Sequence, residues 1–246
     1  MAALLLLGLF ALSGLPPPVD QLERSAARAA PAASPIDAPQ DKALIGRVVV
    51  DEVVARVAPE SDADVIESFG PLNPEGAPQV FLIEDAVDAG APEAEPVWYE
   101  ALLPVRPNGT TGFLPASALD IKPTPYRIEI DRAAFELTLF EDGVEIERYD
   151  VGIGKGKTPT PVGRFYLTSL LRPPDPGSVY GTYAYGLSGY SDTLLDWEGG
   201  GVIGLHGTNN PDSVGRPISH GCIRMRNRDI EELVPILPLG TPIEIV

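Results

Sequence analysis

The residue types that most readily perform covalent chemistry gather in one short segment of this chain. Its only cysteine, Cys222, and its only two histidines, His206 and His220, all lie between residues 206 and 222. A thiol attacks efficiently as a thiolate, and neutral imidazole is the usual base near pH 7. This grouping predicts a cysteine nucleophile that is activated by a histidine.

Either histidine could be that base. His220 lies two residues before Cys222, so on a strand both side chains would point to the same face. His206 follows an apolar segment, and an adjacent strand ending in Cys222 would bring these two side chains together. In either case a nearby imidazolium would favour the thiolate. Gly221 permits a sharp turn before Cys222 and leaves backbone N–H groups exposed, as an oxyanion hole requires.

Two other interpretations compete with catalysis. A lone cysteine is often a buried small hydrophobe, and a lone histidine is often a structural residue. Clustered and flanked by glycine, the three residues favour catalysis over these structural roles. A structural zinc site would need a fourth ligand that the cluster lacks, so neither a metal nor another cofactor is expected.

The composition predicts that β-strands position this cluster. Of 246 residues, 44% are hydrophobic, which suffices for a core, while 27 prolines and 25 glycines favour turns over long helices. The formal net charge of −17 speaks against nucleic acid as a partner, because phosphate binding relies on clustered Lys and Arg. One cysteine cannot form an intrachain disulfide.

The first 42 residues are expected to lie outside the folded domains. Residues 1–15 form an uncharged apolar segment, shorter than the roughly 20 residues of a spanning helix. They are interpreted as a signal peptide or a truncated membrane anchor, with a buried N-terminal strand or helix as the alternative. Residues 16–42, rich in Pro and Ala, are typical of an extended linker. This predicts an extracytoplasmic protein of the cell envelope, either secreted or tethered to the membrane.

Residues 43–121 are expected to form a small β-barrel. Runs of β-branched residues and an Asn-Gly turn at Asn108 indicate short strands with tight connections. The segment WYEALLPVRPNGTTGFLPASAL (98–119) resembles bacterial SH3-like domains. Such a domain could bind the cell wall, or act as a spacer that positions the rest of the chain, which is favoured because no binding motif is present. The sequence KPTP (122–125) indicates a boundary.

Residues 126–246 are expected to form a second, mainly β domain. Apolar and polar residues alternate from Tyr126 onward, Asp142 and Gly143 suit a hairpin turn, and short strands are predicted in GVIGLHG and PIEIV. The Gly- and Tyr-rich stretch that ends at Gly201 is predicted to be a loop. One clear helix is expected in NRDIEELV, with Asn227 as its N-cap.

The segment HGTNNPDSVGRPISHGCIRMRNRDIEEL (206–233), with TPTPVGRF (158–165) upstream, resembles the active-site signature of the L,D-transpeptidase (YkuD-type) catalytic domain family. The resemblance covers roughly residues 126–246. It implies a β-sandwich-like fold with one or two short helices, and a cysteine enzyme of the bacterial cell wall. By this resemblance Cys222 is the nucleophile, His206 the general acid/base, and Gly207 supplies the carbonyl that orients the imidazole.

The resemblance also implies how the pocket is built. Ser219 and His220 would shape it, and the N–H groups of Gly221 and Cys222 would hold the oxyanion. His220 is therefore the second choice for the base and is expected to be a scaffold residue. Arg224 would bind a substrate carboxylate, since guanidinium pairs with carboxylate bidentately. The other nearby arginines are expected to be solvated charges: Arg216, Arg226 and Arg228.

The implied activity is that of a peptidoglycan L,D-transpeptidase. Cys222 would attack the carbonyl of the third residue, a diamino acid, in a donor stem peptide and release the terminal D-alanine. An amine of an acceptor stem peptide would then form the cross-link, whereas water would give a carboxypeptidase and a protein amine an anchoring enzyme. No obligate protein partner is inferred.

Two other classes of protein remain as alternatives. A papain-like wall endopeptidase also uses cysteine and histidine, but there the cysteine precedes the histidine, opposite to the order here. A non-catalytic wall-binding protein would keep the first domain and tolerate the loss of Cys222.

Overall fold

The computed structural model describes residues 42–88, 96–195 and 200–246. The predicted signal peptide or anchor (1–15) and all but the last residue of the predicted linker (16–42) lie outside these residues. The described residues all lie within one compact unit, 39–246. Within the described residues no helix has the length and apolar character needed to cross a membrane. They are mainly β, as predicted, with one α-helix.

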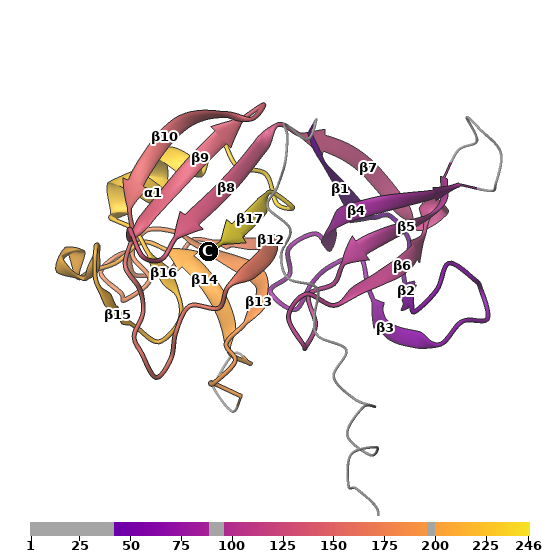
Figure 1. The fold of residues 1–246 in the computed structure, drawn as a ribbon, viewed down its shortest axis with the longest axis horizontal. Coiled ribbons are helices and arrows are strands. Elements are labelled where there is room, and N and C mark those ends of the chain that lie inside the picture. The colour runs from indigo at the N-terminus through magenta and orange to yellow at the C-terminus, as the bar shows by residue number, and fades with distance from the viewer. Residues whose placement is uncertain (1–41, 89–95, 196–199) are drawn as a thin grey trace, which may run out of the picture. The chain divides into compact units, whose positions relative to one another are not determined.

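The N-terminal half (42–124) forms a single antiparallel sheet. Its strands are β1 (Ala43–Val48), β2 (Val53–Arg56), β3 (Val65–Phe69), β4 (Val80–Asp88), β5 (Pro96–Leu102), β6 (Thr111–Pro115) and β7 (Leu119–Thr124), and a 3-10 helix, η1 (Ala116–Ala118), precedes β7. Neighbouring strands follow the order β3-β2-β6-β5-β4-β1-β7 (Figure 1). The predicted hairpin around the Asn-Gly turn is confirmed, because β5 and β6 pair antiparallel.

The sheet of the N-terminal half encloses an apolar core of its own. Buried side chains such as Phe81, Leu103 and Leu114 belong to it, and along β6 buried residues alternate with more exposed ones. β7 pairs with β1 as far as Thr124, so this strand extends into the segment 122–125, which stays a predicted boundary. Pro123 is tolerated there because β7 is an edge strand. The likeness of this half to SH3-like domains stays a prediction.

The C-terminal half (126–246) has most of its strands in one long, folded sheet. Its elements are β8 (Tyr126–Asp131), β9 (Glu136–Glu141), β10 (Val144–Asp150), β11 (Ile153–Gly154), β12 (Gly163–Leu171), β13 (Ala184–Tyr190), β14 (Val202–His206), the 3-10 helix η2 (Pro211–Ser213), β15 (Pro217–Ser219), β16 (Ile223–Arg224), α1 (Asn227–Leu233) and β17 (Pro242–Ile245). Eight strands follow the order β10-β9-β8-β17-β12-β13-β14-β16, and β11 pairs separately with β15.

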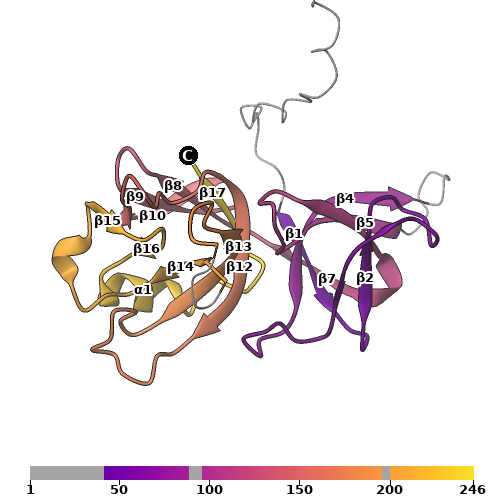
Figure 2. The same ribbon diagram turned by 90° about the horizontal axis from the view of Figure 1, so that it is seen from below.

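This eight-stranded sheet folds back on itself to form a sandwich. Figure 2 shows β8, β9 and β10 on one side of the C-terminal half and β12, β13 and β14 on the other. Both sides contribute fully buried residues to one core, among them Ile128 and Leu205, and α1 adds Ile230 and Leu233. The two edge strands also meet, because Gly152 beyond β10 pairs with Arg224 of β16. The predicted β-sandwich-like fold is confirmed.

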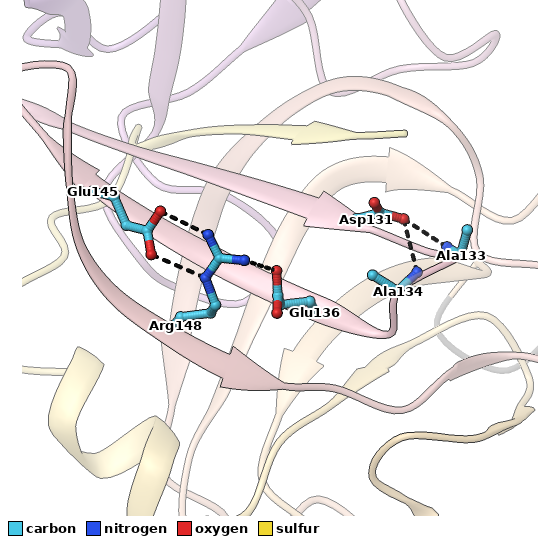
Figure 3. A network of polar contacts seen from close by, with 6 residues as sticks. All are labelled: Asp131, Ala133, Ala134, Glu136, Glu145 and Arg148. Atoms are coloured by element: carbon cyan, nitrogen blue, oxygen red, sulfur yellow. Dashed lines mark hydrogen bonds and ion pairs between the residues drawn. The ribbon is translucent and has the colours of Figure 1, made fainter.

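The hairpins on the outer side follow the sequence closely. Asp142 and Gly143 both have positive φ, 47° and 78°, in the two-residue turn between β9 and β10. Asp131 accepts hydrogen bonds from the N–H groups of Ala133 and Ala134 in the preceding turn (Figure 3). In the same view Arg148 of β10 bridges two carboxylates, Glu136 across the strand pair and Glu145 on its own strand. These polar contacts lie on the solvent face and do not involve the cysteine.

The prediction of a loop up to Gly201 is wrong, because residues 184–190 form β13. The loop prediction failed because the glycines of this stretch were interpreted as turn residues. A Cβ on Gly186 would lie 2.6 Å from Ser169 Oγ, and one on Gly189 would lie 2.5 Å from the ring of Phe165. These glycines therefore permit close packing inside a sheet and do not mark a turn.

The N-terminal and C-terminal halves contact each other through polar and apolar groups. Asn108 donates to Tyr190 O and accepts from Tyr190 N–H, both at 2.8 Å, so its side chain pairs with the backbone at the end of β13. Arg106 donates to Ser191 O at 2.9 Å. Tyr166 of β12, fully buried, packs in one apolar cluster with residues of the N-terminal sheet: Ile45, Val80, Leu82 and Leu102.

Candidate active site

The candidate site lies where β14 and β16 run in parallel. β14 ends at His206, and Cys222 comes directly before β16. In the parallel register Leu205 pairs with Ile223 and His206 with Arg224. Leu205 and Ile223 are fully buried and face the core. Because side chains alternate along a strand, the residues on either side of them face away from it, among them His206 and Cys222.

Gly204 separates the two candidate catalytic side chains. A Cβ on Gly204 would lie 3.7 Å from Cδ2 of His206 and 3.8 Å from Sγ of Cys222, so both side chains flank one point on the sheet. The backbone N–H of Gly204 also donates to Cys222 Sγ, at 3.4 Å. The structure therefore brings together the cysteine and the histidine that were predicted as partners. No hydrogen bond joins them directly, but such contacts often tighten only when substrate binds.

A single hydrogen bond sets the orientation of His206. Its Nδ1 lies 2.6 Å from the carbonyl oxygen of Gly207, and a carbonyl can only accept, so Nδ1 carries the proton. The neutral ring then has its free lone pair on Nε2, next to the Cδ2 atom that faces Gly204. Tyr180, in the loop between β12 and β13, packs edge-on against the imidazole at a centroid distance of 5.1 Å. The imidazole of His206 is thus held with one tautomer and one orientation, as a general base requires.

Both groups of the pair are uncharged at neutral pH. Burial lowers the pKa of His206 from 6.5 to about 4, and the charge of Arg224 acts in the same direction. Burial also raises the pKa of the Cys222 thiol, although the Gly204 N–H and Arg224 oppose this. The site thus favours a neutral thiol and imidazole over the imidazolium–thiolate pair that proximity alone suggests. The proton would move from sulfur to nitrogen during attack.

Hydroxyl groups hold the loop that presents Cys222. Ser219 Oγ, buried, donates to the carbonyl of Cys222 at 2.6 Å and accepts from the N–H of Gly221 at 3.1 Å. Thr160 Oγ1 donates to the carbonyl of Gly221 at 2.7 Å. Gly221 itself has a φ of 123°, which residues with a side chain rarely adopt. The turn before the cysteine therefore depends on this glycine, as predicted from the sequence.

The two backbone N–H groups that were predicted for the oxyanion hole differ in whether they already have a hydrogen-bond partner. The N–H of Gly221 is occupied by Ser219 Oγ. The N–H of Cys222 has no hydrogen-bond partner among the described residues. Cys222 N–H is consequently the donor available to an incoming oxyanion, whereas Gly221 would first have to release Ser219.

His220 is exposed, unlike the buried His206. Its Nε2 lies 3.4 Å from Nζ of Lys155. Its place at the rim agrees with the prediction of a pocket-shaping residue and gives no support to a role as base.

The arginines near the site divide into two groups. Arg224 lies beside the pair and its charge acts on the pKa of both members, while its Nε is buried without a hydrogen-bond partner. Arg226 pairs with Asp150 and Asp229. Arg228 pairs with Asp229 and is mostly exposed. Arg224 is therefore the cation that could meet a carboxylate at the site, and Arg226 and Arg228 are engaged in surface ion pairs.

Asn227 does not cap α1, which corrects the sequence prediction. The helix begins at Asn227, its N-cap position is Arg226, and no side chain caps it. The Asn227 Oδ1 accepts instead from the N–H of Thr208 at 2.8 Å. This contact ties α1 to the segment that follows His206. A cap and a tertiary hydrogen bond use the same amide oxygen, so the sequence alone could not distinguish them.

Sequence reasoning gave no role to Thr160 or Tyr180. Thr160 belongs to the TPTP segment, which resembles an element of the family signature. That resemblance did not predict a role for the Thr160 hydroxyl. Tyr180 lies in the irregular stretch between β12 and β13, where no periodic pattern exists. Within the described residues no group of His, Cys, Asp and Glu could hold a metal ion.

The chain resembles known proteins over its C-terminal half. A family model for the L,D-transpeptidase catalytic domain, YkuD, matches residues 125–245. The YkuD protein of Bacillus licheniformis is 37% identical over 153 residues, which cover 59% of this chain and 85% of that protein. YkuD of Bacillus subtilis is 35% identical over 151 residues, with 59% of this chain and 84% of that protein covered.

A solved structure, Bd1075 of Bdellovibrio bacteriovorus, is 33% identical and aligns with 50% of this chain and 48% of its own, at a TM-score of 0.41. The assignment does not depend on it. The match of the family model and the 85% coverage of a relative with 37% identity, added to the geometry of Cys222 and His206, show that this chain belongs to the YkuD family of L,D-transpeptidase catalytic domains.

Proposed function

We propose that this protein is a peptidoglycan L,D-transpeptidase that works through a cysteine acyl-enzyme. The observation that carries the proposal is the placement of His206 and Cys222 on either side of Gly204, with the imidazole proton fixed on Nδ1 by Gly207. This arrangement supplies a nucleophile, a base and a fixed orientation for that base. Membership of the L,D-transpeptidase family supports stem peptides of peptidoglycan as its substrates.

In the first step Cys222 attacks the carbonyl carbon of the third residue of a donor stem peptide. The thiol proton moves to Nε2 of His206 as the carbon–sulfur bond forms, and the carbonyl oxygen becomes an oxyanion near the Cys222 N–H. When the tetrahedral intermediate collapses, its carbon–nitrogen bond breaks. His206 returns the proton to the leaving amine, and D-alanine departs from a thioester on Cys222.

In the second step an acceptor amine attacks the thioester. His206 takes a proton from that amine, the carbon–sulfur bond breaks, and the thiol is restored as the new amide forms. An amine of a neighbouring stem peptide gives a cross-link. Water in its place would release a shortened peptide, as in an L,D-carboxypeptidase, and the chemistry of the site accommodates both acceptors.

The surrounding residues have supporting roles in this proposal. Arg224, beside the pair, binds a free carboxylate of the donor peptide. Ser219 and His220 shape the pocket around the nucleophile loop. The N-terminal half supports the C-terminal half through contacts such as that of Asn108 with Tyr190 and supplies no chemistry. The substrate places the protein in the cell envelope, outside the cytoplasm.

The experiment is an incubation with a purified disaccharide-tetrapeptide, followed by mass spectrometry of the products. A transpeptidase yields a dimer together with free D-alanine, a carboxypeptidase yields a tripeptide, and an endopeptidase cuts inside the stem. A wall-binding protein without activity leaves the substrate unchanged. Cys222→Ala is the control, and product formed by that variant would contradict the proposal.

A further inference from the structure

The peptide group between Gly221 and Cys222 is held by one buried hydroxyl. Thr160 lies between β11 and β12, is 1% exposed, and donates from Oγ1 to Gly221 O at 2.7 Å. The same oxygen accepts the N–H of Gly154 at 2.9 Å. The donor of the hydroxyl and one of its two acceptor lone pairs are therefore used inside the protein, and these two bonds fix its direction.

This contact determines where the Cys222 N–H points. In a trans peptide the carbonyl oxygen and the following N–H lie on opposite sides of the bond. Because Thr160 holds the oxygen of Gly221, the N–H of Cys222 is directed away from Thr160. That N–H is the one without a partner among the described residues, so it is free to meet a ligand.

The peptide group needs such a restraint because of the glycine that precedes it. Gly221 has a φ of 123°, and glycine adopts several other conformations at similar cost, so rotation of this peptide plane is otherwise easy. The carbonyl of the next peptide is held separately, by Ser219 Oγ at 2.6 Å. Two hydroxyls thus fix the peptide planes on either side of Cys222, and only that of Thr160 acts on the plane that contains the Cys222 N–H.

We propose that Thr160 is a positioning residue for the oxyanion hole: its hydroxyl orients the Gly221–Cys222 peptide so that the Cys222 N–H meets the oxyanion. The inference rests on the proposed function, in which Cys222 forms an acyl-enzyme. It assigns to the threonine a part in transition-state stabilisation that is separate from the reactivity of the thiol. Only a reaction that passes through an oxyanion should depend on it.

The test compares two reagents on the same cysteine. A carbapenem acylates a thiol through a tetrahedral oxyanion, whereas iodoacetamide alkylates it by displacement at a saturated carbon, where no oxyanion forms. The rates of both reactions are measured by intact-protein mass spectrometry for wild type, Thr160→Val and Thr160→Ser. Valine keeps the branched shape without the hydroxyl, and serine restores the hydroxyl.

We expect Thr160→Val to slow carbapenem acylation by about 10²-fold, the scale on which a lost oxyanion-hole donor acts. The rate of iodoacetamide alkylation should stay close to that of wild type, and Thr160→Ser should recover most of the acylation rate. If Thr160→Val does not fold, Thr160→Ala removes the same hydroxyl from a smaller side chain and takes its place in the comparison.

Equal slowing of both reagents in the folded valine or alanine variant would overturn the proposal, since it would indicate general damage to the site. Unchanged acylation would overturn it as well. Failure of the proposed function looks different: wild type would then form no carbapenem adduct, or Cys222→Ala would still form one.

Discussion

The two halves of the described chain differ in what they bury. Both have apolar cores between paired strands, but among described residues the N-terminal half buries only two polar side chains, Gln79 and Thr124. The C-terminal half buries many more: Thr138, Thr158, Thr160, Ser169, Ser188, Ser191, His206, Thr208, Ser213, Ser219, Asp229 and Thr241. A buried polar group is costly unless it is hydrogen-bonded, and the hydroxyls of Thr160 and Ser219 among these have such partners.

The difference in buried polar side chains follows from the backbone of each half, which is mostly regular strand in the first and irregular around Cys222 in the second. In the N-terminal half the strand ladders satisfy most backbone groups, and few side chains are needed for this. Around Cys222 the backbone is irregular, and hydroxyls such as those of Thr160 and Ser219 bind its carbonyls. Some of the buried polar side chains, such as Thr160 and Ser219, therefore fix a backbone that no ladder holds, in the turn that presents Cys222.

The largest expected effect is the loss of covalent acylation in Cys222→Ala. This variant removes the only thiol of the chain, so no carbapenem adduct should form, while wild type should gain one adduct per protein in the intact mass. Ser61→Ala, at an exposed position in the N-terminal half, serves as the control and should react like wild type. An adduct on Cys222→Ala would place the chemistry elsewhere.

The second effect separates the two histidines. His206→Ala should slow carbapenem acylation by about 10²-fold or more, because it removes the general base. His220→Ala should have a much smaller effect, since that side chain is exposed and contacts Lys155. The rates are compared in variants whose circular dichroism matches wild type. A stronger effect of His220→Ala would mean that the base has been assigned to the wrong histidine.

The third effect is an unusual pH dependence. Because the pKa of His206 is lowered to about 4, the imidazole stays neutral and active well into the acid range. The acylation rate should stay nearly constant from pH 7 to pH 5 and fall to half near pH 4, measured with a carbapenem at each pH. An imidazole with the ordinary pKa of about 6.5 would instead lose more than tenfold by pH 5.

The same shift in pKa links pH to stability, which gives a control that does not depend on activity. The unfolded chain binds a proton at His206 near pH 6.5 and the folded chain only near pH 4. Stability is thus retained above pH 6.5 and lost as pH falls toward 4, by about 3 kcal/mol. His206→Gln should show a smaller acid loss than wild type in urea unfolding. Equal losses would contradict the burial argument.

The smallest expected effect concerns the N-terminal half. Asn108→Ala removes two hydrogen bonds to the backbone of Tyr190 and should lower the free energy of unfolding by about 1–3 kcal/mol. The chemistry should persist, because no residue of the N-terminal half contributes to the site described above. Denaturant unfolding and carbapenem acylation are measured on the same sample. A large loss of acylation without a loss of stability would show that this half takes part in the reaction.

Much of the fold could be predicted from local patterns. Alternation of apolar and polar residues predicted the strands at both ends of the C-terminal half, and Asp142 with Gly143 predicted its hairpin. The stretch 184–190 could not be predicted, because its glycines are required by Ser169 and Phe165, which lie on another strand. Asn227 was misassigned for the same reason: its partner, Thr208, is distant in the sequence.

The sequence by itself determined the chemistry that this protein can perform. One cysteine and two histidines in a glycine-flanked cluster, within a family signature, predict the nucleophile and restrict the predicted base to two candidates, because few residue types can play these parts. Only the tertiary structure places His206 near Cys222, through the parallel pairing of β14 with β16, and orients its imidazole through the carbonyl of Gly207. The burial of His206 and the hydrogen bond from Thr160 to Gly221 also come from the tertiary structure. Burial and hydrogen-bond direction depend on atoms that come together only when the chain is folded, so no local pattern can specify them.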